Sequence, residues 1–212
     1  MTGPRRLVLL RHGRTDWNAS HRIQGQQDSH LDDVGLAQAR TVAPAVAGMS
    51  PSLLWSSDLA RAHRTAEEVA AATGLPLRTD VRLREFGLGE YERLTHDELR
   101  AQDPAGFERF RRGAWEDIPG AEHPREVAER MVAVLTELAG ALDDGATGVA
   151  VSHGAAIRTG LVAFLGWPLE TARTLRGMGN CGRVVLEQRE GGDWALTSYN
   201  LPPDFTSPTA VG

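Results

Sequence analysis

The most informative absence from this 212-residue sequence is lysine, because all 23 of its lysine-or-arginine positions are arginine. Without lysine the chain can neither form a Schiff base with a carbonyl substrate nor build a phosphate-binding P-loop. Cysteine occurs once, as Cys181, which excludes an intrachain disulfide and suits a reducing compartment. We therefore predict a cytoplasmic location, with Cys181 as a small buried side chain.

Other absences limit the partners and cofactors of the protein. No apolar run approaches the roughly 20 residues that span a bilayer, so we expect no membrane partner. The net charge of −5 argues against general binding to nucleic acid. The sequence has no HExxH motif, no Cys/His cluster and no paired-aspartate site, so we predict chemistry without metal or other cofactor. Five histidines share no metal-ligand spacing: His21, His30, His63, His96 and His123.

Short apolar runs alternate with amphipathic helical segments, a pattern typical of an α/β protein with a mainly parallel sheet. The predicted strands are Leu7–Leu10, Leu53–Trp55, Leu77 with Val81–Leu83, Val149–Val151, and a hairpin of Val184–Glu187 and Ala195–Tyr199. The predicted helices are Leu36–Ala47, Leu59–Thr73, a helical stretch from Thr95 to Gly113, Arg125–Leu142 and Ala155–Leu165. At this length we expect one domain over residues 1–200 and a loose tail over 201–212.

The segment Arg11-His12-Gly13 directly follows the predicted strand Leu7–Leu10. Open α/β sheets bind their ligands at the carboxyl ends of strands, which places this histidine where a ligand is expected. A neutral imidazole can attack phosphorus, and the neighbouring guanidinium can hold two phosphoryl oxygens. An isolated Arg-His pair is more often a core histidine beside a surface arginine. The glycine turn and the continuation Thr15–Asn18 favour the functional interpretation.

Two further segments carry related signals. Ser152-His153-Gly154 repeats the His-Gly turn after the predicted strand Val149–Val151, and its imidazole is suited to donate a hydrogen bond to a phosphoryl oxygen. Arg61 falls in the first turn of a predicted helix, with Ser57 or Asp58 as its cap. From there Arg61 can reach back over the sheet edge toward a ligand.

A carboxyl group completes the candidate set. Glu85 follows the predicted strand that ends at Leu83 and is a candidate general acid for protonating a leaving alkoxide. Glu90 and Glu92 are rivals that the sequence does not exclude. Asn18 and Gln24 add neutral hydrogen-bonding groups.

Together these blocks resemble the histidine phosphatase superfamily, also called phosphoglycerate-mutase-like. Arg11-His12-Gly13 with Thr15 and Asn18 looks like its signature. The spacing to three later blocks also fits, namely Ser56–Ala62, Leu83–Glu85 and Ser152–Gly154. The resemblance extends from Arg6 to about Leu186 and implies a three-layer α/β/α sandwich with a mostly parallel central sheet.

The resemblance also implies roles for the candidate residues. His12 would be phosphorylated, and Glu85 would be the proton donor. The phosphoryl group would be clamped by Arg11, Arg61 and His153. The substrate pocket would be lined by Asn18, Gln24 and Gly154. Two guanidinium groups and an imidazole would supply the positioning and charge that phosphoryl transfer needs without magnesium.

Two departures from the family pattern concern the leaving-group side. Tyr91-Glu92-Arg93 places an arginine where family members often carry glycine, and Gly120-Ala121-Glu122-His123 replaces the usual Gly-Gly-Glu-Ser. Both leave the catalytic step intact and leave the substrate open, including whether Arg93 and His123 contact it.

Three functions remain as alternatives. The segment between Glu85 and His153 looks short beside those of the cofactor-dependent mutases, which favours hydrolysis of a small phosphosugar or phosphoglycerate derivative. Arg176–Asn180 is similar to a block of the glucosyl-3-phosphoglycerate phosphatases, although it also reads as a turn. The second alternative is a phosphoglycerate-type mutase. The third is a catalytically silent regulator that binds a phosphorylated ligand. The resemblance also allows a homodimer.

Overall fold

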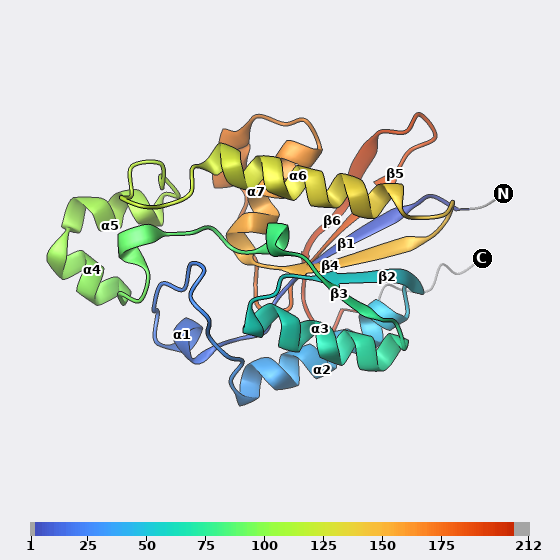
Figure 1. The fold of residues 1–212 in the computed structure, drawn as a ribbon, viewed down its shortest axis with the longest axis horizontal. Helices are drawn as coiled ribbons and strands as arrows, with labels where there is room; N and C mark the ends of the chain where they lie inside the picture. The colour runs from blue at the N-terminus through green and yellow to red at the C-terminus, as the bar shows by residue number, and fades with distance from the viewer. Residues whose placement is uncertain (1–2, 206–212) are drawn as a thin grey trace.

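The computed structural model describes residues 3–205, which form one six-stranded sheet with helices on both faces (Figure 1). The strands are β1 (Arg6–Arg11), β2 (Pro51–Ser56), β3 (Leu77–Thr79), β4 (Thr147–Ser152), β5 (Arg183–Gln188) and β6 (Trp194–Leu201). Their order across the sheet is β3-β2-β4-β1-β5-β6. Neighbours among β1 to β4 are parallel, and the predicted hairpin β5–β6 adds two antiparallel strands at one edge.

The helices lie in the segments that connect the strands. They are α1 (Asp16–Ala19), α2 (Asp33–Ala47), α3 (Ala60–Thr73), α4 (His96–Gln102), α5 (Pro104–Arg111), α6 (Pro124–Gly140) and α7 (Gly154–Phe164). The described residues also include the 3-10 turns η1 (Val81–Leu83), η2 (Gly89–Tyr91) and η3 (Leu169–Arg173).

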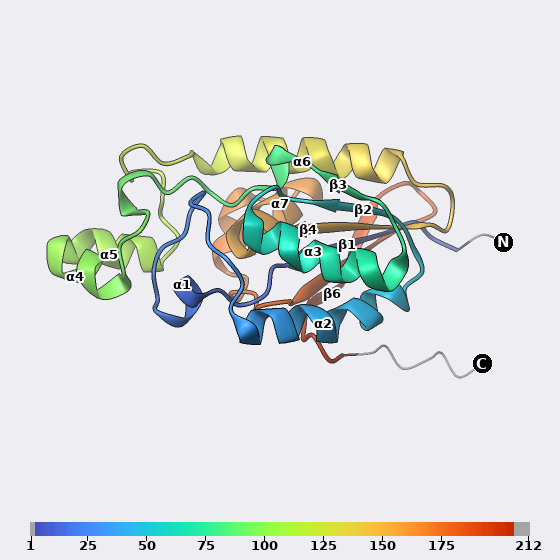
Figure 2. The same cartoon turned by 60° about the horizontal axis from the view of Figure 1, so that its bottom comes forward.

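Alternate residues of β1 face opposite sides of the sheet and build two cores. Leu7 and Leu9 belong to the core under α6 and α7, whereas Val8 and Leu10 belong to the core under α2 and α3. All four side chains are at most 1% exposed. Figure 2 shows the sheet between these two helical layers. The predicted three-layer α/β/α sandwich with a mostly parallel sheet is confirmed.

The predicted strand over Val81–Leu83 is wrong, because these residues form the 3-10 turn η1. The carboxylate of Asp80 accepts hydrogen bonds from the backbone N–H of Arg82 at 2.9 Å and from its Nε at 2.9 Å. Such local side-chain bonds close a turn in place of an extended ladder. Glu85 therefore follows a turn and lies beyond the sheet.

The predicted helical stretch from Thr95 to Gly113 is interrupted. Pro104 has no backbone N–H and does not continue α4, while the carboxylate of Asp103 accepts a hydrogen bond from the backbone N–H of Gly106 at 2.8 Å and starts α5. The two helices stand away from the sheet at the end where β1 and β4 finish (Figure 1).

The predicted cap of α3 is also wrong. Leu59 occupies the N-cap position without a side-chain bond, and the carboxylate of Asp28 accepts from the first backbone N–H of the helix at 2.8 Å. Asp58 instead pairs with the guanidinium of Arg84, whose Nε lies 2.8 Å from its carboxylate. That ion pair lowers the pKa of Asp58, because the charged hydrogen bond favours the ionised carboxylate.

Gly13 lets the turn after β1 pack against the start of α2. A Cβ on Gly13 would lie 2.5 Å from the carbonyl oxygen of Gly35, and a Cβ on Gly35 would lie 1.9 Å from that of Arg14. Any side chain at either position would collide with backbone, so both positions need glycine. This close approach holds the chain immediately after His12.

The first residues of the predicted tail are anchored. Leu201 completes β6, and the guanidinium of Arg183 donates hydrogen bonds to the carbonyls of Pro202 and Phe205. The rest of the predicted tail, 206–212, lies outside the described residues. None of the helices within residues 3–205 is long and apolar enough to cross a membrane.

Candidate active site

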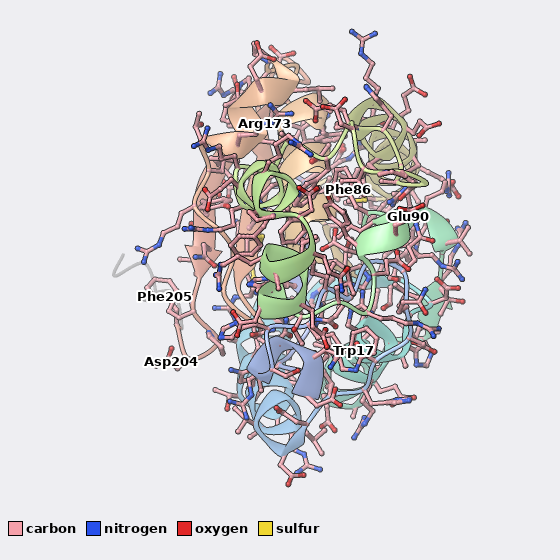
Figure 3. The ribbon with its side chains drawn as sticks, turned by 90° about the vertical axis from the view of Figure 1, so that its left-hand side faces the viewer. Trp17, Phe86, Glu90, Arg173, Asp204 and Phe205 are labelled. Atoms are coloured by element: carbon pink, nitrogen blue, oxygen red, sulfur yellow. The ribbon has the colours of Figure 1, made fainter. Side chains whose placement is uncertain are left out.

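The candidate residues meet where three neighbouring strands end. In the parallel register Arg11 of β1 is opposite Ser152 of β4, and Ser56 of β2 is opposite Val151. The residues that follow these strands therefore share one edge of the sheet. Figure 3 looks onto this end of the molecule, with Phe86, from the segment of Glu85, among the residues that it labels.

His12 is buried, with 3% of its surface exposed, and its ring is held in one orientation. Its Nδ1 lies 2.7 Å from the carbonyl oxygen of Gly13. A carbonyl only accepts, so Nδ1 carries the proton and Nε2 carries the lone pair. Burial, followed by the charges of Arg61 and Arg11, lowers the pKa of His12 well below its usual value. The side chain is thus a neutral imidazole with a free nucleophilic nitrogen.

His153 lies beside His12, with the two ring centroids 5.2 Å apart. Its Nε2 is 2.9 Å from the hydroxyl oxygen of Ser57, whereas its buried Nδ1 has no hydrogen-bond partner among the described residues. Burial and the nearby arginine Arg61 lower the pKa of His153 as well. The free Nδ1 of His153 is a group that a bound ligand can satisfy.

Arg11 and Arg61 place two guanidinium groups near these rings. Arg61 is fully buried and donates to the carbonyls of Gly25 and Gln27 at 2.8 Å each, while Arg11 donates to the carbonyl of Met178 at 2.5 Å. Burial lowers the pKa of both, that of Arg61 to about 10. Guanidinium groups stay protonated in proteins, so both carry a positive charge. Carbonyls fix their orientation without neutralising them, which favours binding of an anion.

The Nε atoms of the same two arginines support this interpretation. Within residues 3–205, the Nε of Arg11 and that of Arg61 are buried and lack a hydrogen-bond partner. Together with Nδ1 of His153, they make three unsatisfied nitrogens on the residues around His12. A tetrahedral oxyanion offers acceptors for such donors.

Glu85 is held at the N-terminus of α7. Its Oε1 accepts from the backbone N–H of Ala156 at 2.8 Å and its Oε2 from that of Ala155 at 3.2 Å. The Glu85 carboxylate also offsets part of the downward pKa shift of Arg11 and of Arg61, which places it in the same electrostatic environment.

The rival carboxylates have other positions. Glu90 is exposed on η2 (Figure 3), whereas Glu92 accepts from the backbone N–H groups of Gln26 and Leu88 at 2.9 Å each. Glu92 therefore braces the loop around Gln26. Of the three glutamates, Glu85 is the one whose carboxylate bonds the N-terminus of α7, the helix that starts beside His153 and carries Gly154.

Asn18 and Gln24 meet around Thr15. The Asn18 Oδ1 accepts from the backbone N–H of Thr15 at 3.2 Å, and the Gln24 Oε1 accepts from the Thr15 hydroxyl at 3.2 Å. The amide of Asn180 donates to the Asn18 Oδ1 at 3.2 Å and to the His12 carbonyl at 3.3 Å. This chain of bonds ties both predicted pocket residues to the backbone of His12.

Gly154 lies against Arg11. A Cβ added to Gly154 would sit 3.4 Å from the Arg11 Nε, which is an ordinary contact and no collision. The structure thus brings all eight predicted site residues to one end of the sheet. Their names are Arg11, His12, Asn18, Gln24, Arg61, Glu85, His153 and Gly154.

Several residues of the site were not predicted in these roles. Ser57 was expected as a cap and instead contacts His153, and Met178 and Asn180 contact Arg11 and His12 through backbone and amide groups. The available signal was the block Arg176–Asn180, which also reads as an ordinary turn ahead of a strand. Its distance of more than 160 residues from His12 hid the contact.

A cavity of about 470 Å³ opens beside Glu85, and Phe86 and Ala155 form part of its wall. Its lining contains five arginines and two glutamates, although the whole chain carries a net charge of −5. Arg173 is paired with Glu116 at 2.8 Å, whereas the buried Nε of Arg158 has no partner among the described residues. The cavity is therefore a basic compartment adjoining the end of the sheet that carries the candidate residues, which is the proposed catalytic edge.

The two residues at the family departures differ in position. His123 lines the cavity and caps α6, its Nδ1 accepting from the backbone N–H of Arg125 at 3.2 Å. Arg93 instead donates to the side-chain oxygen of Gln27, with its Nε 2.9 Å away. Arg93 thus supports the loop whose Gln27 carbonyl holds Arg61.

The described part of the chain contains no candidate metal site. Over residues 3–205, no group of three or more His, Cys, Asp or Glu side chains is arranged to hold a metal ion. Cys181 is buried, as predicted, and burial raises the pKa of its thiol to about 12.

A neutral buried histidine among arginines at the strand ends of an α/β sandwich is typical of proteins that transfer phosphoryl groups through histidine. The chain belongs to the histidine phosphatase superfamily (branch 1), whose family model matches residues 7–202.

Individual relatives cover nearly the whole chain. A glucosyl-3-phosphoglycerate phosphatase of Mycolicibacterium vanbaalenii is 40% identical over 217 residues, covering 92% of this chain and 94% of its own. A probable phosphoglycerate mutase GpmB of Yersinia pestis is 37% identical over 194 residues, covering 91% and 89%. The solved mycobacterial glucosyl-3-phosphoglycerate phosphatase in complex with VO3 has a TM-score of 0.86 and 37% identity, covering 92% and 98%.

Proposed function

We propose that this protein is a metal-independent phosphomonoesterase that hydrolyses a small phosphorylated metabolite through a phosphohistidine at His12. One observation carries the proposal: the Gly13 carbonyl holds the proton on Nδ1, so Nε2 is free to attack. Burial, followed by the charges of Arg61 and Arg11, lowers the pKa of the ring, which keeps it neutral at physiological pH.

The reaction proceeds in two displacements. The His12 Nε2 attacks phosphorus, the ester P–O bond breaks, and Glu85 gives its proton to the departing oxygen. Water then attacks the phosphohistidine while Glu85 takes back a proton, which releases inorganic phosphate and the neutral imidazole. Arg11, Arg61 and His153 stabilise the charge on the transferring oxygens in both steps.

The basic cavity indicates the chemistry of the leaving group. The Glu85 carboxylate lies next to this cavity, since it accepts from the backbone N–H of Ala155, a residue that lines the cavity. The group that Glu85 protonates therefore extends into a compartment rich in arginine. A leaving group with a carboxylate fits that charge, and the cavity volume of about 470 Å³ is in the range of sites for small metabolites.

The relatives support the same substrate class. Glucosyl-3-phosphoglycerate, the substrate in the printed name of the mycobacterial relatives, is a phosphate ester that also carries a carboxylate and a sugar. We therefore place glucosyl-3-phosphoglycerate and related phosphoglycerates first among the candidate substrates. The proposed setting is the cytoplasm.

Phosphate release tests this function directly. We expect hydrolysis of p-nitrophenyl phosphate and faster hydrolysis of carboxylate-bearing esters in a panel of phosphosugars and phosphoglycerates. Chelator leaves both rates unchanged, because the proposed chemistry uses no metal. A large loss that magnesium restores contradicts the metal-free mechanism. Failure to release phosphate from any ester, together with tight phosphate binding, favours the silent regulator.

Arg158 should discriminate carboxylate-bearing esters from neutral ones. Replacing Arg158 with methionine removes a cavity charge, so KM for 3-phosphoglycerate rises about tenfold to hundredfold, as expected for a lost charged hydrogen bond. KM for p-nitrophenyl phosphate, which has no carboxylate, changes little. A rise of equal size for both esters argues against a carboxylate contact at Arg158.

A phosphoglycerate mutase is the second candidate, and it is favoured by the 37% identity to the probable mutase of Yersinia pestis. A mutase must pass the phosphoryl group to a second hydroxyl before water reaches it. It would require a bisphosphate primer and would isomerise 3-phosphoglycerate faster than it releases phosphate. Measuring both products in one reaction decides between the two.

A further inference from the structure

The segment Gly120-Ala121-Glu122-His123, which departs from the family pattern, contains a carboxylate that the catalytic steps do not use. Glu122 forms a two-point ion pair with Arg130 of α6, through Nε to Oε1 at 3.0 Å and Nη2 to Oε2 at 2.9 Å. The Arg130 side chain is only 16% exposed. A paired, largely buried guanidinium of this kind holds its surroundings in a fixed geometry.

The remaining bonds of Arg130 all run to the backbone that leads to Glu85. Its Nη1 donates to the carbonyls of Arg82 and Arg84 at 2.8 and 2.6 Å, and its Nη2 donates to the carbonyl of Glu85 itself at 2.9 Å. The one carbonyl skipped, that of Leu83, accepts from the hydroxyl of Ser152 at 2.7 Å. Side chains thus satisfy four consecutive carbonyls.

The hydrogen bonds to these four carbonyls hold the backbone where no strand pairing does so. Because η1 is a turn, residues 82–85 have no strand partner to fix their backbone. Glu122 also holds the neighbouring backbone, since its carboxylate accepts from the backbone N–H of Gly87 at 2.7 Å and from the side-chain amide of Gln26 at 2.9 Å. The Gln26 amide also donates to the Glu85 carbonyl at 3.1 Å.

We propose that Arg130 and Glu122 form a positioning pair that holds the proton donor Glu85 in register with the leaving group. This proposal rests on the proposed function. One end of Glu85 is bonded through its carbonyl to Arg130, and the other through its carboxylate to the N-terminus of α7. Losing Arg130 leaves the Glu85 carbonyl with the weaker bond from the Gln26 amide at 3.1 Å and loosens the backbone end. Displacements of about 1 Å reduce catalysis up to about a hundredfold.

The test compares leaving groups. In a single turnover, Arg130→Met should slow phosphorylation of His12 by an alkyl ester such as 3-phosphoglycerate about thirtyfold, and phosphorylation by p-nitrophenyl phosphate less than about threefold. Phosphorylation rates are compared because Glu85 also serves the later hydrolysis step, which both esters share. The difference arises because p-nitrophenolate leaves without a proton, whereas an alkoxide needs Glu85. The KM values should change little, since Arg130 does not touch the phosphoryl group.

A double substitution separates positioning from general loss of structure. In a Glu85→Gln background the proton donor is absent, so adding Arg130→Met should leave the rates of both esters unchanged. A structural defect would instead lower the rates of both esters by the same additional factor. Glu122→Gln, the milder change, should reproduce the selective loss of alkyl rate at about fivefold if Arg130→Met does not fold.

Glu137→Gln provides the matched control. Glu137 lies on the same helix and pairs with Arg78 and Arg82 at 2.8 and 2.6 Å, but it makes no bond to Glu85. Its loss should leave the ratio of alkyl to aryl rates unchanged. Equal slowing of both esters in Arg130→Met overturns the positioning role while leaving the hydrolase intact. Absence of phosphate release from the unaltered protein contradicts the proposed function itself.

Discussion

His12→Ala is expected to lower kcat for every phosphate ester by at least about 10³-fold, because it removes the one nitrogen poised to attack phosphorus. His153 does not replace it. The Nε2 of His153 contacts the Ser57 hydroxyl, and the residue follows β4, whereas His12 follows β1. The measurement is phosphate release from p-nitrophenyl phosphate and 3-phosphoglycerate under saturating conditions.

The same variant should keep its affinity for inorganic phosphate within about tenfold, because Arg11, Arg61 and His153 remain in place. His63→Ala is the matched control: this half-exposed histidine on α3 contacts Glu67, away from the catalytic edge. Near-normal turnover by His12→Ala contradicts the mechanism. If the variant loses both phosphate binding and turnover, the substitution has damaged the whole site and does not test the role of His12 alone.

Glu85→Gln is expected to slow alkyl phosphates by about 10² to 10⁴-fold, the usual contribution of a positioned general acid. Phosphorylation of His12 by p-nitrophenyl phosphate should be slowed far less, because its leaving group needs no proton. Glutamine preserves the size of the side chain and one acceptor for the backbone N–H groups at the start of α7. The measurement is the pre-steady-state burst of nitrophenolate beside the steady-state rate with 3-phosphoglycerate.

Glu90→Gln serves as the control for Glu85, since Glu90 is exposed and should tolerate the change. If Glu85→Gln slows phosphorylation of His12 equally with both classes of ester, the proton comes from another group. The selective loss of alkyl turnover in Glu90→Gln would then reassign the acid to that residue.

Elements with strong local signals were predictable from the sequence. The four apolar residues of β1 and the end of α3 at Thr73, followed by Gly74 with a φ of 72°, lie where the pattern placed them. Elements decided by side-chain competition were not: Asp80 closes η1 by bonding Arg82, and Pro104 splits a continuous amphipathic pattern. Hydrophobic periodicity carries no information about such bonds.

The candidate catalytic residues were predictable for a different reason. His12 and His153 each follow a buried strand, and parallel strands bring such positions to one edge regardless of the distance between them in the sequence. The bonds that orient them come from loops with no periodic signal. The Met178 carbonyl that holds Arg11 and the Arg130 guanidinium that holds Glu85 required the folded chain.

Trapping the phosphoenzyme tests the central claim most directly. Glu85→Gln protein is mixed with p-nitrophenyl phosphate and quenched in alkali, since the variant should form the intermediate readily and hydrolyse it slowly. Peptide mass spectrometry should find one phosphoryl group on His12, labile to acid and absent from His12→Ala. A phosphoryl group on another residue, or continued turnover with His12 unmodified at every quench time, contradicts the account.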